Sequence, residues 1–448
     1  MKRVKKVNPS AVFIAGFFAL IIIGAILLSL PVSSANGEST PFFSSLFTAV
    51  SSTCITGLIV YDTFTHWSFF GQAVLLSLIQ LGGLGFMTVA TVFSLLFRRS
   101  VGQRERLLLA QNFNLDETSG IIRLVKLILA GTFSFEGAAA VVLSFRFIPE
   151  YGFLSGIWRG VFVSVSAFCN AGFDLMGSHG AFSSLTPYAD DLTVNLTVCA
   201  LITVGGLGFL VWQDIFSGKK FSEMSFQSKI VISFSGALII IGAAAIFMIE
   251  FTNPETLGAL SLKGKALSAV FQSVTARTAG FNTLDLAALR EPSQIIMIIL
   301  MFIGGSSGST AGGIKTNTVA VLFFAAVSVI RGRKEAVVMK KRIPQDTVLR
   351  AFALVFISLM ILLVFSFAIS VAESIPFTAS LFECVSAFCT VGLTLGITPS
   401  LSAFSLTLLM ILMFLGRIGL LTLSVALFRK QASSENGVRY PEAKITIG

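Results

Sequence analysis

Long apolar segments alternate with short polar loops along the whole chain. A helix needs about 20 apolar residues to cross the hydrocarbon core of a bilayer. Eight segments reach this length, at about 11–30, 69–97, 121–145, 192–215, 230–250, 293–330, 347–371 and 402–428. Each pair of them encloses a shorter apolar stretch, at about 41–52, 157–168, 266–275 and 376–388. These four stretches are too short to span and predict re-entrant pore helices, which a membrane tolerates only inside protein or beside a watery cavity.

Each short stretch runs into a segment that ends in glycine. These four glycine segments read CITG, CNAG, RTAG and CTVG, at 54–57, 169–172, 277–280 and 389–392. A second glycine cluster follows each of them, at 82–85, 205–208, 304–305 and 416–419. Two landmarks that stay in phase indicate duplicated units. The sequence therefore predicts an all-α integral membrane protein with four tandem helix–pore helix–helix repeats around one central pore, at 1–110, 111–226, 227–342 and 343–448.

Composition and charge agree with this architecture. The chain is 54% hydrophobic and 12% charged, with a mean hydropathy of +0.88, which excludes an ordinary water-soluble domain. The N-terminus, the stretches 98–126, 214–229 and 331–350, and the C-terminal tail hold 24 Lys or Arg against 9 Asp or Glu, whereas the opposite loops hold 6 against 12. Because Lys and Arg stay in cytoplasmic loops, both termini are expected in the cytoplasm and the glycine segments enter from outside.

The pI of 9.6 raises the question of nucleic acid. The basic residues cap membrane helices, so we expect no nucleic-acid partner. Their one-sided placement instead favours anionic membrane lipid or a cytoplasmic partner protein.

The glycine segments are candidates for an ion selectivity filter. A dehydrated monovalent cation needs oxygens that replace its hydration shell, and rings of backbone carbonyls supply them. Glycine permits the positive φ that turns successive carbonyls to one side. One such glycine would more often serve helix packing, but four in register behind pore helices favour a filter at 53–57, 168–172, 276–280 and 388–392. The candidate residues are Ile55, Thr56, Gly57, Asn170, Ala171, Gly172, Thr278, Ala279, Gly280, Thr390, Val391 and Gly392.

The second helix of the third repeat is interrupted by GGSSGSTAGGIKT at 304–316. So many glycine, serine and threonine residues cannot form a stable lipid-facing helix, which predicts a loop inside the pore. A phosphate-binding loop is disfavoured because Ile314 separates Gly313 from Lys315 and Thr316. The candidate loop residues are Gly304, Gly305, Ser306, Ser307, Gly308, Ser309, Thr310, Ala311, Gly312 and Gly313.

Five charged residues lie at or near membrane depth, where a charge is costly unless it faces a cavity or a partner. Arg417 either repels cations at the cytoplasmic end of the pore or binds carbonyls freed by the broken helix. Lys315 has the same two interpretations, and the structural one is favoured. Arg277, which replaces the cysteine of the other repeats, either braces neighbouring pore loops, which is favoured, or contacts the ion directly. Glu136 needs a polar partner that the sequence does not name. Asp174 either raises the cation concentration at the mouth or caps a loop.

An enzyme is disfavoured. Membrane-embedded catalysis needs a cluster of His, Asp, Glu or Cys, whereas Glu136, Lys315 and Arg417 lie in different repeats and the chain has only two histidines. Cys54, Cys169 and Cys389 occupy one repeat position and are expected to be packing residues, so no covalent cofactor is expected. A transporter with inverted repeats is also disfavoured, because the repeats are parallel and only the third-repeat helix is expected to be broken.

Together and in order, these motifs resemble the Trk, Ktr and HKT potassium transporter superfamily, most closely the membrane subunit of bacterial Ktr systems, over essentially all 448 residues. The resemblance implies potassium uptake across the bacterial plasma membrane, with K⁺ at the filter carbonyls. It implies that the 304–313 loop, with Lys315 and Arg417, forms a gate beneath the filter.

The resemblance also implies partners. Ktr membrane subunits are homodimers docked on a cytoplasmic ring of RCK-type regulatory subunits that bind ATP and ADP, and dependence on Na⁺ is common in the superfamily. A sodium-selective or non-selective cation transporter of the same superfamily is the alternative. Gly57 argues for potassium, because a serine at this position accompanies sodium selectivity in related plant transporters.

Overall fold

The apolar runs of the sequence become helices in a computed structural model, which describes residues 9–85, 121–333 and 335–420. The first repeat contains α1 (Pro9–Ser29), η1 (Pro31–Ser33), α2 (Phe42–Thr53), α3 (Thr63–His66) and α4 (Phe69–Leu84). The second contains α7 (Ile121–Tyr151), α8 (Phe153–Phe168), η2 (Thr186–Tyr188), α9 (Leu192–Leu207) and α10 (Phe209–Phe216).

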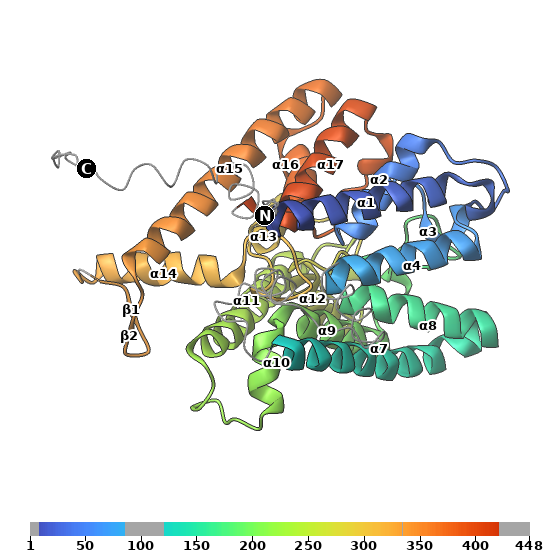
Figure 1. The fold of residues 1–448 in the computed structure, drawn as a ribbon. Helices are drawn as coiled ribbons and strands as arrows, with labels where there is room; N and C mark the ends of the chain where they lie inside the picture. Colours follow the sequence, from blue (N-terminus) through green and yellow to red (C-terminus); the bar gives the residue numbers. More distant parts are fainter. Residues whose placement is uncertain (1–8, 86–120, 334, 421–448) are drawn as a thin grey trace, which may run out of the picture.

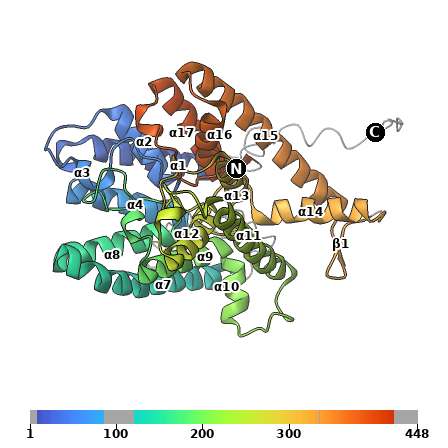
Figure 2. The same cartoon turned by 180° about the vertical axis from the view of Figure 1, so that it is seen from behind.

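The third repeat contains α11 (Phe226–Glu250), η3 (Leu257–Ala259), α12 (Leu262–Thr275), α13 (Glu291–Phe302) and α14 (Thr316–Ile330). A short antiparallel hairpin of β1 (Val337–Val338) and β2 (Lys341–Arg342) follows, with Val338 opposite Lys341. The fourth repeat contains α15 (Gln345–Glu373), α16 (Phe377–Phe388), η4 (Thr398–Ser400) and α17 (Ala403–Ile418). Figures 1 and 2 show α14 and the hairpin extending from the body on the side away from α3.

Helix starts follow local capping chemistry. The second helix of repeats one, two and four begins at a capping side chain that accepts a backbone N–H three residues on: Ser68 from Gly71, Asp191 from Val194 and Ser402 from Ser405. In the third repeat, Pro292 lies in the first turn of α13, where its missing N–H costs nothing.

The four repeats close into a ring. Each first helix packs on its own pore helix, as α1 on α2, α7 on α8, α11 on α12 and α15 on α16. The second helix of each repeat then packs on the pore helix of the next repeat, as α4 on α8, α9 on α12, α13 on α16 and α17 on α2. The last of these contacts joins the fourth repeat to the first, so the predicted arrangement around one centre is confirmed.

The outer helices present apolar faces away from this centre. Phe145 on α7, Met248 on α11 and Val364 on α15 are 75%, 73% and 65% exposed. Helices α7, α11 and α15 are each long and apolar enough to cross a membrane, and α9 with α10 forms a fourth, bent candidate. The chain therefore has the fold of a membrane protein. Parts of the predicted spans 69–97 and 402–428 lie outside the described residues, so the count of eight stays a prediction.

The expectation that only the third-repeat helix is broken is wrong. Helices α9 and α10 are bent by 100° at Gly208, where a single span was expected over 192–215. Gly208 has φ 92° and ψ 147°, and the glycines that end α4 and α17, Gly85 and Gly419, share this conformation, with φ of 79° and 83°. A side chain at Cβ resists such a backbone. The second glycine cluster therefore stops the helix in three of the four repeats.

Candidate pore and its loop

The four glycine segments meet in a closed ring at the centre of the molecule. A Cβ placed on Gly57 would meet the Ala171 carbonyl oxygen of the next repeat, and the same relation holds for each neighbouring pair around the ring, at 2.8 Å or less. The remaining pairs are Gly172 with Ala279, Gly280 with Val391, and Gly392 with Thr56. Backbone therefore lies against backbone at each junction, with no room for a side chain.

Each glycine segment has the same alternating backbone. The second of the four residues has positive φ in every segment, with values between 51° and 77°. These residues are Ile55, Asn170, Thr278 and Thr390. The glycines also have positive φ, between 71° and 91°, whereas the residue between them does not. Alternation between left-handed and ordinary backbone turns successive carbonyls to the same side.

The amide groups of these segments turn away from the ring centre. The N–H groups of Thr56, Ala171, Ala279 and Val391 donate to carbonyl oxygens in the last turns of their own pore helices, at 2.7–2.9 Å. In the first and fourth repeats a serine hydroxyl, Ser51 or Ser386, accepts the glycine N–H at 3.1 Å. No hydrogen bond among residues 9–85, 121–333 and 335–420 ends on a carbonyl oxygen of the twelve candidate filter residues. Twelve carbonyls are thus available to a cation.

Glycines of the second helices hold the pore helices in place. A Cβ on Gly82, Gly205 or Gly416 would overlap the carbonyl oxygen of the last pore-helix residue of the same repeat, which is Thr53, Phe168 or Phe388. Close backbone approach is a known use of glycine in membrane helices. In these three repeats the second glycine cluster therefore packs on the end of the pore helix that leads into the glycine segment.

The 304–313 loop lies against the first residues of the glycine segments. A Cβ on Gly312 would overlap the Thr390 side chain, and one on Gly304 would lie 3.3 Å from the Thr278 methyl group. The Thr310 hydroxyl donates to the Phe168 carbonyl at 3.3 Å, at the carboxyl end of α8. The loop thus touches the second, third and fourth repeats directly under the ring.

The bend at Gly208 provides the loop with its other partners. The Ser306 N–H donates to the Gly206 carbonyl at 3.0 Å and the Ser306 hydroxyl donates to the Leu207 carbonyl. In return, the Phe209 N–H donates to the Gly308 carbonyl at 2.8 Å. Backbone groups that the bend in α9–α10 leaves without helical partners are satisfied by the loop.

Arg277 joins the third glycine segment to both ends of the loop. Its guanidinium donates to the Gly304 carbonyl at 3.2 Å and to the Thr316 hydroxyl at 2.8 Å, and to the Ser235 carbonyl in α11 at 3.4 Å. The side chain is 8% exposed. Arg277 therefore contacts the loop and α11, rather than the neighbouring pore loops named in the sequence-based expectation.

Arg417 and Lys315 both contact loop carbonyls. The Arg417 guanidinium donates to the Thr310 carbonyl and, at 2.5 Å, to the Gly82 carbonyl of α4. It thereby ties the fourth and first repeats to the loop of the third. Lys315 donates to the Ala311 carbonyl at 2.6 Å, four residues back in the loop. These contacts match the anchoring interpretation of both residues, and the positive charges still lie beside the pore.

Glu136 has a partner that the sequence did not indicate. The Gln80 side chain of α4 donates to its carboxylate at 3.2 Å, and the Cys169 thiol lies 3.8 Å from the same carboxylate. The pair crosses between the first and second repeats. The three repeat-position cysteines, Cys54, Cys169 and Cys389, are fully buried behind the ring.

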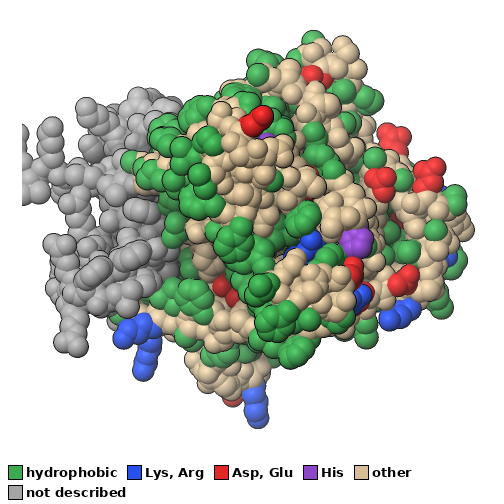
Figure 3. All heavy atoms as spheres, turned by 90° about the vertical axis from the view of Figure 1, so that its right-hand side faces the viewer, with side chains coloured by type: hydrophobic (Ala, Val, Ile, Leu, Met, Phe, Trp, Pro, Cys, Tyr) green, Lys and Arg blue, Asp and Glu red, His purple; other side chains and the backbone are tan. Residues whose placement is uncertain are grey.

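Two carboxylates lie at the mouth above the ring. Asp174 follows the second glycine segment and accepts the Met176 N–H at 2.8 Å, while Asp62 accepts the Phe182 N–H at 3.0 Å. Burial, with the negative charge of Asp62 added, raises the pKa of Asp174 to about 7. Figure 3 looks onto the end of the molecule where α3 lies and shows acidic side chains spread over it.

Two buried ionic residues of this region escaped the sequence analysis. Glu383 in α16 accepts bonds from the Leu395 N–H and the Thr394 and Thr398 hydroxyls, which fixes the chain after the fourth glycine segment. Arg159 in α8 donates to the Leu175 carbonyl and the Ser178 hydroxyl after the second segment. Both residues could have been identified from the sequence, because each is a charged residue within a predicted re-entrant pore helix.

Comparison with known proteins agrees with this geometry. The model of the TrkH family, described as cation transport protein, matches residues 8–440. The chain is 40% identical to the Ktr system potassium uptake protein B of Bacillus subtilis, over 98% of this chain and 97% of that protein. It is also 40% identical to the potassium/sodium uptake protein NtpJ of Enterococcus hirae, over 100% of this chain and 99% of that protein.

Solved structures give the same fold. The crystal structure of the potassium transporter TrkH from Vibrio parahaemolyticus matches with a TM-score of 0.73 at 16% identity, and covers 96% of this chain and 87% of that one. The resemblance inferred from the repeats and glycine segments is confirmed by the family match, which spans more than nine-tenths of the sequence. The chain belongs to the TrkH family of cation transport proteins.

Proposed function

We propose that this chain is the pore-forming, potassium-translocating subunit of a Ktr-type uptake system in the bacterial plasma membrane. The observation that carries the proposal is the closed ring of twelve backbone carbonyls, none of which accepts a hydrogen bond among the described residues. Carbonyl rings replace the hydration shell of K⁺. Two relatives that are 40% identical over nearly the whole chain are named as potassium or potassium/sodium uptake proteins.

In this mechanism K⁺ loses most of its water at the carbonyls of the four glycine segments. The 304–313 loop then obstructs the path, and the charges of Lys315 and Arg417 oppose cation passage while the loop stays in place. When the loop moves aside, K⁺ enters the cytoplasm down its electrochemical gradient. Each 100 mV of inside-negative potential favours a monovalent cation by about 2.3 kcal/mol, so no second energy source is required.

The orientation and the partners belong to the same proposal. The described parts of the stretches 98–126, 214–229 and 331–350 carry more than half of the described Lys and Arg residues, which supports a cytoplasmic location for this face and for both termini. By family resemblance, the protein works as a homodimer on a cytoplasmic ring of RCK-type subunits that bind ATP and ADP. Dependence on Na⁺ is included because one relative is named a potassium/sodium uptake protein.

The second candidate function is sodium-selective or non-selective cation transport by the same pore. The name of the Enterococcus hirae relative is the observation that favours it. The proposal prefers potassium because Gly57 leaves the first carbonyl position free of a side chain.

Rubidium uptake into potassium-loaded liposomes that contain only this protein tests the proposal. External K⁺ should block uptake and external Na⁺ should spare it, with protein-free liposomes as the blank. Equal block by both ions would establish a non-selective pore, and stronger block by Na⁺ would establish the alternative. If no uptake occurs, addition of the cytoplasmic ring separates a closed gate from a wrong substrate.

A further inference from the structure

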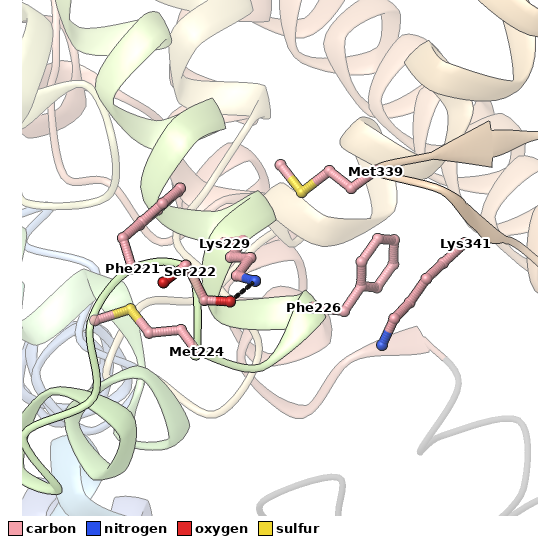
Figure 4. A pocket seen from close by; sticks show the side chains of 7 residues that line it. All are labelled: Phe221, Ser222, Met224, Phe226, Lys229, Met339 and Lys341. Carbon is pink, nitrogen blue, oxygen red and sulfur yellow. Dashed lines mark hydrogen bonds between the residues drawn. The ribbon is translucent and has the colours of Figure 1, made fainter.

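A pocket of about 270 Å³ lies on the face of the protein opposite the mouth. It is formed between the loop that joins α10 to α11 (217–225), the first turn of α11 and the β1–β2 hairpin. Phe221, Met224, Phe226 and Met339 supply apolar walls, and Lys229 and Lys341 supply the charge. Figure 4 shows Phe226 between the two lysines, with Phe221 and Met224 on one side and Met339 above.

Two basic residues beside the pocket are ion-paired, whereas the pocket lysines, like Lys220 and Lys340, have no ion pair among the described residues. Lys219 is paired with Asp214 at 2.6 Å and Arg342 with Glu335 at 2.8 Å. Within the part of the chain that the structure describes, no carboxylate pairs with Lys229 or Lys341. No lining residue is acidic. The pocket therefore has a local positive charge that no described carboxylate neutralises.

Both ammonium groups are held in place with donors to spare. The Lys229 ammonium donates to the Ser222 carbonyl at 2.5 Å, which uses one of its three N–H groups. The Lys341 ammonium lies 5.7 Å from the centre of the Phe226 ring, within cation–π range. The hairpin that carries Lys341 is fixed by a small core of Ala336, Val338 and Ile343. The two lysines that flank the Phe226 ring are thus largely fixed in place before an anion binds.

The apolar side chains that line the pocket indicate which class of anion it binds. Phe221 and Met339 are 49% and 48% exposed beside the charges. An inorganic anion would gain nothing from these side chains, whereas an amphiphile would cover them. Two cations next to an exposed apolar wall match a headgroup phosphate with its acyl chain.

The pocket lies at the depth where such a molecule sits. Phe226 is the first residue of α11, and 25 helical residues measure about 37 Å, more than the roughly 30 Å of hydrocarbon in a bilayer. The first turn of α11 therefore reaches the headgroup layer. The end of α14 exposes Val329 and Ile330 at 72% and 84%, as expected of residues in contact with lipid.

We propose that this pocket binds an anionic phospholipid of the cytoplasmic leaflet. Lys229 and Lys341, on either side of the Phe226 ring, supply the positive charge for the headgroup, and an acyl chain runs along Phe221, Met224 and Met339. A protein partner is the weaker fit, because the pocket is small and lies at the hydrocarbon boundary. The inference rests on the chain's membership of a membrane protein family and not on which ion it transports.

Native mass spectrometry of the detergent-purified full chain with added phosphatidylglycerol tests this site. The double variant Lys229→Gln/Lys341→Gln should bind the lipid about 30-fold more weakly, since each lysine at a membrane surface contributes about a fivefold factor. The control Lys220→Gln/Lys340→Gln removes the same charge from the adjoining 217–225 loop and from the hairpin, at positions that do not line the pocket, and should retain wild-type binding. Lys229→Arg/Lys341→Arg should also retain it.

Equal loss in the control, or no loss in the pocket variant, would overturn the proposal. Glycerol phosphate, which has the headgroup chemistry without acyl chains, should bind at least tenfold more weakly than the lipid, and equal binding would make this an anion site instead. If the variant keeps the lipid but loses a cytoplasmic protein subunit, the pocket is a protein docking surface. If the double variant does not fold, Lys341→Glu on the exposed hairpin replaces it. The experiment measures lipid binding and not rubidium flux, so a negative result would contradict the lipid site without contradicting the transport proposal.

Discussion

The guanidinium of Arg277, the first residue of the third glycine segment, donates a hydrogen bond of 3.2 Å to the carbonyl of Gly304, the first residue of the loop beneath it. The same side chain binds Thr316, just beyond the other end of the loop. The ring and the loop are therefore joined through one residue, within one repeat.

We expect Arg277→Met to loosen the loop. A hydrogen bond to a charged group contributes about 1.5 kcal/mol at the lower end, so loss of one favours the displaced loop about tenfold. Rubidium uptake without any regulatory partner should rise by a similar factor. Arg159→Met is the matched control, because Arg159 is equally buried but binds the chain at the mouth. Unchanged uptake in folded Arg277→Met protein would show that this residue does not restrain the loop.

Gly57→Ser and Gly280→Ser should weaken the discrimination between potassium and sodium. Both glycines have positive φ near 90°, and a Cβ at either would press on a carbonyl oxygen of the next repeat. We expect the preference for K⁺ over Na⁺ to fall about tenfold, since left-handed backbone costs an L-residue roughly 1–2 kcal/mol.

Competition of the two ions against rubidium uptake measures this preference. Gly37→Ser is the control, because Gly37 also has positive φ but a Cβ there meets nothing within 4 Å. If both filter variants keep the wild-type preference, these glycines are not part of the selectivity filter.

Gly416→Ala should disrupt the fourth repeat. Its Cβ would overlap the Phe388 carbonyl at the end of α16, so the pore helix must move. We expect a fall of several degrees in the thermal unfolding midpoint in detergent. Gly236→Ala in α11 has open space around its Cβ and should be neutral or stabilise the protein by up to about 1 kcal/mol. Equal midpoints for the two variants would argue against close packing at Gly416.

Asp174 should make stability depend on pH between about 4 and 7. Burial raises the pKa of its carboxyl to about 7, above the value of about 3.9 in an unfolded chain, so the folded state binds the proton more tightly. This contribution is complete below pH 4 and is lost as pH rises through 7. The unfolding midpoint should therefore fall from pH 5 to pH 8 less steeply in Asp174→Asn, which keeps an acceptor for the Met176 N–H. Parallel slopes would mean that Asp174 is not the titrating group.

The sequence predicted the glycine segments and the broken third-repeat helix because glycine and serine at membrane depth have few alternative explanations. The bend at Gly208 was missed because GGLG is apolar and looks continuous with its helix, and only the positive φ reveals the stop. The partners of buried polar side chains in other repeats could not be predicted from the sequence. Gln80 and Glu136 are 56 residues apart and meet across two repeats, so no local spacing connects them.

The partners of Arg417 could not be predicted from the sequence either. A positive charge this deep in the last helix has a desolvation cost, so the sequence predicts that some partner offsets it. The partners are the backbone carbonyls of Thr310 and Gly82, which no side chain in the sequence identifies. Glu383 was overlooked for a similar reason, because its threonine partners lie in an ordinary-looking stretch after the fourth segment.

Among the described residues, the third repeat has a loop between the two halves of its second helix, α13 and α14, whereas α9 and α10 of the second repeat meet directly at Gly208, although the ring above has contributions from all four repeats. A fourfold gate built from separate subunits can open in stages, whereas a single strand of chain is either in the path or out of it. Electrical recordings from one reconstituted pore should consequently step between zero and one current amplitude, without sublevels, and the dwell times alone should respond to a regulator.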